Sequence, residues 1–178
     1  MEFILNYARC SKYSILNIII TMKKILFVCM GNICRSPAAE AVMKKLIYNQ
    51  NLNKEYFIDS AGTINLHKGE KADSRMIFHS SKRGYDITSI SRQIENKDYL
   101  EFDKIVVMDQ QNYKDVINKC PDKKFEDKII NISDFFTKHN DKKVPDPYYG
   151  EGKDFEYVLD LLEDACQELL AKLVNHDI

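Results

Sequence analysis

Residues 28–37 read VCMGNICRSP: a cysteine, a gap of five residues, an arginine and a serine, with a regular pattern on either side. Residues 24–28 (KILFV) form an apolar run bounded by charge, which is typical of a buried strand. After the segment, apolar residues recur at helical spacing, at Ala38, Ala41, Val42 and Leu46. The stretch therefore predicts a strand, a tight loop and a helix in that order.

The loop between this strand and helix has the residues of an anion site built around a sulfur nucleophile. N–H groups in the first turn of a helix have no partner within the helix, so they point at an anion placed there. The same field, with nearby cations, holds the pKa of a cysteine well below its ordinary value of about 8.5. Arg35 can contact two phosphate oxygens at once and stays charged. We therefore expect Cys29 to be a nucleophile that faces a bound phosphate.

Other residues of the loop suit this chemistry. Gly31 and Asn32 fit a tight curve because glycine, and asparagine less freely, tolerate positive φ. Ser36 can donate a hydrogen bond to the sulfur, and Pro37 fits a first helical turn. The residues predicted to bind phosphate or support the loop are Met30, Gly31, Asn32, Ile33, Cys34 and Ser36. The alternative is that both cysteines are ordinary buried residues at the end of a strand.

On these residues the chain resembles the low-molecular-weight protein tyrosine phosphatases. The resemblance runs from Met22 to the C-terminus and rests on the cysteine loop and on residues 146–150 (DPYYG), which look like the family's general-acid loop. Residues 59–63 (DSAGT) and 108–109 (MD) also match family segments. The resemblance implies hydrolysis of phosphotyrosine in proteins or peptides through a phosphocysteine intermediate, with phosphate as product and no cofactor. The catalytic residues that it implies are Cys29, Arg35 and Asp146.

Residues 146–150 have a physical logic of their own. A tyrosyl oxygen leaves phosphorus more easily when a positioned acid protonates it, which is typically worth about 10²- to 10⁴-fold. Asp146 is the candidate acid, and once deprotonated it could activate the water that hydrolyses the phosphocysteine. Pro147 stiffens the loop. Taken alone, the segment also fits a plain surface turn, but its combination with the cysteine loop favours the catalytic interpretation.

The predicted substrate pocket is partly aromatic. Tyr148 and Tyr149 would wall a slot for a phenyl ring. Many family members carry a tryptophan or tyrosine where this chain has Leu66, followed by His67, so the pocket is less aromatic here. Some members also have a histidine at the place of Ser89. The residues predicted to line the pocket are Ile33, Leu66, Tyr148 and Tyr149.

Composition agrees with one catalytic domain. The chain has 178 residues, 44% of them hydrophobic, which is enough for a single substantial core. Its net charge of −1 gives no reason to expect nucleic acid as a partner. Five widely spaced cysteines, an odd number, favour a reducing, cytoplasmic compartment over a disulfide scaffold. The four histidines lack metal-ligand spacing, so we expect no metal site.

Strand and helix patterns alternate along the chain. Further strands are expected at residues 56–58, 104–108 and 128–132, and a helix is expected from about Asp73 to Gly84. The last helix carries a continuous apolar stripe formed by Phe155, Val158, Leu159, Leu162, Cys166, Leu169 and Leu173. Such alternation predicts a doubly wound α/β fold, a four-stranded parallel sheet with helices on both faces. The resemblance implies the same architecture, the flavodoxin-like phosphatase I fold.

Residues 1–21 do not belong to this pattern, so we place the catalytic domain at residues 22–178. Residues 14–20 (SILNIII) are apolar, but the run is short, contains an asparagine and is soon followed by two lysines, so no membrane span is expected. A signal peptide would have a cleaner apolar core and a small-residue cleavage site. Met22 stands where chains of the family usually start. We expect residues 1–21 to be dispensable; the alternative is a targeting or docking arm.

Three other functions share parts of this pattern. Arginine phosphatases of the same fold usually carry threonine where this chain has Ile33. Arsenate reductases coupled to thioredoxin have a dedicated downstream cysteine pair, whereas Cys120 and Cys166 are far apart in this sequence. A non-catalytic phosphotyrosine-binding module should lack the nucleophile or the acid, and this chain has both.

Cys34 suggests redox sensitivity. A thiolate acidic enough to attack phosphorus is open to peroxide, and a second thiol can trap the sulfenic acid that forms. Cys34 follows Cys29 by five positions on a loop that curls around one anion, so it could be that trap. The alternative is a small apolar filler beneath the loop.

Overall fold

The computed structural model describes residues 22–178, and a four-stranded parallel sheet forms its centre. The strands are β1 (Lys23–Cys29), β2 (Tyr56–Gly62), β3 (Lys104–Val107) and β4 (Ile129–Asn131). Their order is β2-β1-β3-β4, and every neighbouring pair is parallel. The four predicted strands are confirmed, although β2 continues past its predicted end to Gly62.

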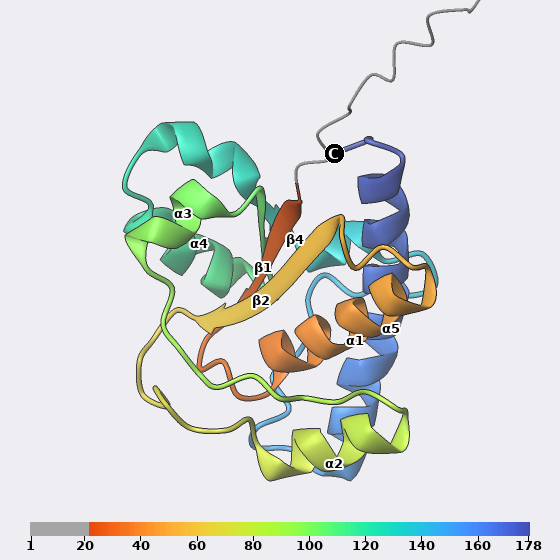
Figure 1. Cartoon of the computed structure of the whole chain (residues 1–178). Helices are drawn as coiled ribbons and strands as arrows, with labels where there is room; N and C mark the ends of the chain where they lie inside the picture. The colour runs from red at the N-terminus through yellow and green to blue at the C-terminus, as the bar shows by residue number, and fades with distance from the viewer. Residues whose placement is uncertain (1–21) are drawn as a thin grey trace, which may run out of the picture.

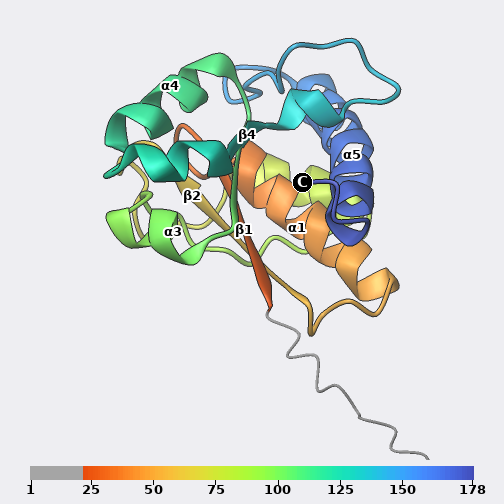
Figure 2. The ribbon, with the colours of Figure 1, turned by 90° about the horizontal axis from the view of Figure 1, so that it is seen from above.

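Helices cover both faces of the sheet, as Figures 1 and 2 show. One face carries α1 (Arg35–Asn49) and α5 (Gly152–Val174), against which α2 (Ser74–Lys82) packs. The other face carries α3 (Asn96–Glu101) and α4 (Gln110–Lys119). Two 3₁₀ helices flank β4, η1 (Lys123–Lys128) and η2 (Ile132–Phe135). The doubly wound α/β fold is therefore confirmed.

The position of β1 in the sheet explains why residues 25–28 are all apolar. Ile25 and Phe27 belong to the core cluster under α1 and α5, while Leu26 and Val28 belong to the cluster under α3 and α4. All four side chains are fully buried, because successive residues of a strand face opposite sides of the sheet. Burial of each such side chain contributes about 1.5–3 kcal/mol. The central strand therefore anchors both halves of the core and the loop that follows it.

The topology gathers the ends of the strands at one edge. The chain runs from β1 to β2 on one side and then returns to β3 on the other side of β1. Ligands of such sheets bind beyond the carboxyl ends of the strands, at the point where the order reverses. Cys29 ends β1, and Asp109 follows β3 closely in the chain. The fold thus brings the cysteine loop to the place where a ligand is expected.

The helix ends agree with their sequence signals. Asp73 caps α2 by accepting a hydrogen bond from the backbone N–H of Arg75, and Gly84, with φ of 78°, follows the end of that helix. None of the helices within residues 22–178 is both long enough and apolar enough to cross a membrane. The expectation that residues 1–21 are dispensable concerns a segment outside the described residues.

Candidate active site

The sulfur of Cys29 lies at the N-terminus of α1. Its side chain is buried, and Sγ is 3.1 Å from Ser36 Oγ and 3.3 Å from the backbone nitrogen of Asn32, which donates to it. No side chain of residues 22–178 caps the first turn of α1. The N–H groups of that turn are therefore left for an anion, and the helix field favours the thiolate.

Asn32 braces the loop and fixes where the proton of Ser36 can go. It has φ of 55°, and its Oδ1 accepts from the backbone N–H of Arg92 at 3.0 Å. Its Nδ2 therefore faces two hydroxyls, Ser36 Oγ and Ser60 Oγ, both at 2.9 Å. Because Ser36 accepts from Asn32, its own proton is available for the sulfur of Cys29. The backbone carbonyl of residue 61, at 3.2 Å, is the alternative acceptor.

A buried carboxylate completes this network. Ser60 Oγ donates to Glu40 Oε2 at 2.5 Å, and the ammonium group of Lys44 pairs with Glu40 Oε1 at 2.5 Å. Glu40 is a buried charge, so the pairing with Lys44 one turn along α1 offsets much of the cost of its burial. Ser60 lies in the DSAGT segment that matches the family, but the sequence assigned no role to either residue.

Residues 91 and 92 support the cysteine loop. Ser89, which stands where some relatives have a histidine, makes no side-chain hydrogen bond within the described part of the chain. The hydroxyl of Ser91 instead donates to the carbonyl of Gly31 at 3.0 Å, and the backbone of Arg92 reaches Asn32. The loop is thus supported by residues that follow Ser89.

Arg35 is 3% exposed and sits between two carboxylates. Its Nη1 is 2.6 Å from Asp109 Oδ2 and 3.3 Å from the Val144 carbonyl, and its Nη2 is 2.8 Å from Asp146 Oδ2. Its Nε has no partner among the described residues. A guanidinium has five N–H donors. Two donors therefore remain, the number that a bidentate phosphate contact uses.

Arg35 stays protonated although its side chain is buried. Burial alone would lower its pKa, but the negative charges of Cys29 and Asp146 and the hydrogen bond to Asp109 outweigh that effect and raise it. Asp109 was not predicted as a site residue. The only sequence signal for Asp109 was its match to a family segment. Asp109 lies directly after β3 and also caps α4, where its carboxylate accepts from Asn112 N at 2.7 Å.

Residues 146–150, called the acid loop below, form a tight turn against α5. Gly150 N donates to the Pro147 carbonyl at 2.8 Å, and Tyr148 N donates to Asp146 Oδ1 at 3.2 Å. A β-carbon at Gly150 would lie 2.9 Å from Cβ of Asp154, in the first turn of α5. The glycine is therefore required by the close approach of the turn to this helix.

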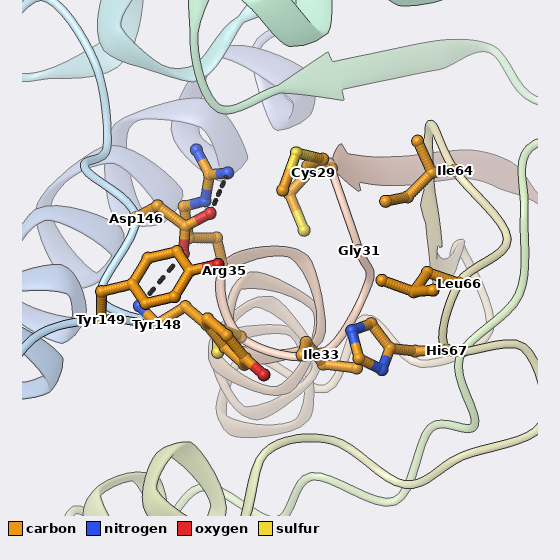
Figure 3. A pocket seen from close by; sticks show the side chains of 12 residues that line it. Cys29, Gly31, Ile33, Arg35, Ile64, Leu66, His67, Asp146, Tyr148 and Tyr149 are labelled. Carbon is orange, nitrogen blue, oxygen red and sulfur yellow. Dashed lines mark hydrogen bonds and ion pairs between the residues drawn. The ribbon is translucent and has the colours of Figure 1, made fainter.

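The predicted site residues meet around one cavity of about 160 Å³. Figure 3 shows Arg35, Asp146 and the two tyrosines on one side of it, and Leu66, Ile64 and His67 on the other. Cys29 and Ile33 also line the cavity, whereas Asn32 and Ser36 act from behind the loop. The lining residues are Cys29, Met30, Gly31, Ile33, Cys34, Arg35, Ile64, Leu66, His67, Asp146, Tyr148 and Tyr149.

The rim of the cavity is apolar and open. Tyr149 is 96% exposed and packs edge-to-face on Tyr148, with ring centroids 4.9 Å apart. Leu66 is 72% exposed across the opening, so the position that is aromatic in many relatives is a freely accessible aliphatic side chain here. His67 was not predicted to line the pocket. Its Nδ1 is 2.8 Å from Glu70 Oε2, and its ring lies against Gly31.

The remaining cysteines are free thiols within the described residues. Burial raises the pKa of Cys34, which lines the cavity, and burial likewise raises the pKa of Cys166 in the core. Cys166 is thus part of the apolar stripe of α5, as expected. Within residues 22–178 no group of three or more histidine, cysteine or acidic side chains could hold a metal ion.

Comparisons with known proteins show the family to which the chain belongs. The family model for low molecular weight phosphotyrosine protein phosphatase matches residues 24–177. The human protein of that name is 36% identical over 150 residues, 84% of this chain and 95% of the human protein. The crystal structure of a protein tyrosine phosphatase from Entamoeba histolytica is 49% identical with a TM-score of 0.86, covering 88% of this chain and 99% of that one. A Drosophila arginine phosphatase is 27% identical with a TM-score of 0.76, covering 84% and 97% respectively. The chain therefore belongs to the low molecular weight phosphotyrosine protein phosphatase family.

Proposed function

We propose that this protein hydrolyses phosphotyrosine monoesters in proteins or peptides through a phosphocysteine intermediate. The observation that carries the proposal is that Cys29 and Arg35 line one cavity at the N-terminus of α1, where Arg35 keeps two N–H donors without a partner among the described residues. Release of phosphate from a phosphotyrosine peptide in the presence of EDTA tests it. Turnover that needs a divalent metal would contradict it.

In the first step the thiolate of Cys29 attacks phosphorus and the bond to the tyrosyl oxygen breaks. Asp146 gives its proton to that oxygen, so the phenol leaves neutral. The Asp146 carboxyl is 2.8 Å from Arg35, which places the acid next to the phosphate that Arg35 would hold. The N–H groups of the loop and Arg35 stabilise the charge on the equatorial oxygens.

In the second step water attacks the phosphocysteine. The Asp146 carboxylate takes a proton from that water, and the phosphorus–sulfur bond breaks. Ser36, 3.1 Å from the sulfur, stabilises the departing thiolate by donating its proton in a hydrogen bond. The products are inorganic phosphate and the resting enzyme.

The other functions have less support from the site. A binding module needs neither an acid nor a nucleophile, whereas Asp146 and Cys29 both line the cavity. An arsenate reductase would need a downstream cysteine pair near the nucleophile. Cys166 lies on the buried face of α5, and Cys120 directly follows α4; neither lines the cavity.

Ile33 should set the preference between phosphotyrosine and phosphoarginine. Its aliphatic side chain lines the cavity, where it favours a planar phenyl ring over a strongly hydrated guanidinium. We expect kcat/KM to be higher for a phosphotyrosine peptide than for a phosphoarginine peptide, and Ile33→Thr to narrow that gap. Ile90→Thr, the same change at an exposed isoleucine that does not line the cavity, should leave the ratio unchanged. Equal kcat/KM values for both peptides in the unchanged enzyme would favour the arginine phosphatase.

We also propose a redox response of the same site, because Cys34 lines the cavity together with Cys29. The compartment that we propose for the protein is the reducing cytoplasm. Peroxide converts the Cys29 thiolate to a sulfenic acid; the Cys34 thiol then attacks that sulfur, a disulfide forms and water leaves. After peroxide treatment, dithiothreitol should restore the activity of the unchanged enzyme but not of Cys34→Ser. Mass spectrometry should detect a peptide crosslinked between Cys29 and Cys34. Equal recovery of both proteins, without a crosslink, would reduce Cys34 to packing.

A further inference from the structure

Asp73 and Arg75 form an ion pair at the start of α2, outside the lining of the cavity. The Asp73 carboxylate accepts from the Arg75 backbone N–H at 2.8 Å, from Nε at 3.0 Å and from Nη2 at 2.7 Å. The side-chain hydrogen bonds from Arg75 hold the pKa of Asp73 below its ordinary value. These hydrogen bonds direct the guanidinium relative to the start of α2, although nearly half of the side chain is exposed.

This pair touches both loops of the active site through their backbone. The N–H of Asp73 donates to the Ile33 carbonyl of the cysteine loop at 2.8 Å. Nη2 of Arg75 donates to the Tyr148 carbonyl of the acid loop at 2.9 Å. The cysteine loop and the acid loop, more than a hundred residues apart in the chain, are thus both hydrogen-bonded to the N-terminal end of α2.

The contact with Tyr148 bears directly on the acid. The backbone N–H of Tyr148 donates to Asp146 Oδ1 and so orients the carboxyl group of Asp146. The backbone carbonyl of the same residue, Tyr148, accepts the hydrogen bond from Arg75. The guanidinium also lies over two rings, 5.6 Å from the centroid of Tyr148 and 4.8 Å from that of Phe155 in α5. Such cation–π contacts restrain the loop further.

We propose that Arg75 is a positioning residue for proton transfer, which holds the acid loop so that Asp146 faces the leaving oxygen. The proposal rests on the proposed function. Arg75 does not line the cavity, so it acts through Tyr148 and not on the phosphate. Lysine is a poor substitute, because one ammonium cannot reproduce the planar fork that serves Asp73 and the Tyr148 carbonyl together.

A leaving-group series tests this role. In Arg75→Gln we expect kcat/KM for esters of weakly acidic phenols, phosphotyrosine included, to fall by roughly 10- to 100-fold, because a misplaced group costs up to about 10²-fold. Esters of very acidic phenols, which need little protonation, should lose less than about threefold. The kcat/KM values of Arg75→Lys for these esters should lie between those of the unchanged enzyme and those of Arg75→Gln. In an Asp146→Asn background, Arg75→Gln should have almost no further effect, since the proton donor is already absent.

Arg83 provides the matched control. It lies directly after α2 and pairs with Glu156, Asp160 and Glu163 of α5. Arg83→Gln therefore weakens the contact of α2 with α5 but leaves the hydrogen bond to the acid loop in place. Its effect on kcat/KM should be small and equal across the series.

The outcomes separate the two proposals. If the unchanged enzyme hydrolyses none of these esters, the proposed function fails. If it hydrolyses them but Arg75→Gln and Arg75→Lys slow all esters equally, or add fully to Asp146→Asn, the positioning role is wrong. Circular dichroism and phosphate affinity show whether each variant is folded. If Arg75→Gln unfolds, the leaving-group series of Arg75→Lys still tests the positioning role.

Discussion

Replacement of Cys29 by serine is expected to reduce kcat by at least about 10⁴-fold while phosphate still binds. A serine hydroxyl stays protonated even at the N-terminus of α1, so the nucleophile is lost. The donors that bind the anion, the first-turn N–H groups and Arg35, do not change. Hydrolysis of p-nitrophenyl phosphate measures the loss, and calorimetric titration with phosphate measures the binding that remains.

Two controls accompany this variant. Cys120→Ser removes a partly exposed thiol that does not line the cavity, and its activity should stay close to that of the unchanged enzyme. EDTA should not affect turnover. Substantial activity in Cys29→Ser, or a loss with EDTA, would overturn the proposed mechanism.

Replacement of Asp146 by asparagine is expected to slow phosphotyrosine hydrolysis by roughly 10²-fold or more. Asparagine can keep the hydrogen bond from Tyr148 N, but it has no proton to give to the leaving oxygen. Esters of very acidic phenols should be slowed much less. A plot of log kcat/KM against the pKa of the leaving phenol should therefore be steeper for the variant.

Asp141→Asn is the matched control for this change. Asp141 accepts a hydrogen bond from Tyr157 at 2.8 Å and does not line the cavity, so its replacement should leave the plot unchanged. A uniform loss across the leaving-group series in Asp146→Asn would show that Asp146 is not the acid.

The central part of the fold could be read from local sequence because its chemistry is local. Residues 25–28 of β1 are buried on both faces of the sheet, so all four are apolar, and the loop after the strand places Cys29 and Arg35 six positions apart around one anion. The same holds for α5, whose long stripe faces the core. Patterns of this kind depend only on neighbours in the chain.

The supporting residues could not be read in this way because their partners come from distant segments. Arg35 meets Asp109 across 74 positions, and Ser60 meets Glu40 across 20. Polar residues in such contacts have no periodicity to distinguish them from solvated ones. The short helix α3, with six residues, is likewise too brief for an apolar stripe.

The two carboxylates around Arg35 have a consequence for how the pocket attracts an anion. Asp109 and Asp146 both pair with the one guanidinium, so its positive charge is more than compensated before phosphate arrives. The attraction for phosphate therefore comes from oriented N–H groups, those of the cysteine loop and of the first turn of α1, together with the donors of Arg35 that remain free. Such dipoles act at close range, so the pocket recognises phosphate by the direction of its donors and not by a long-range positive field.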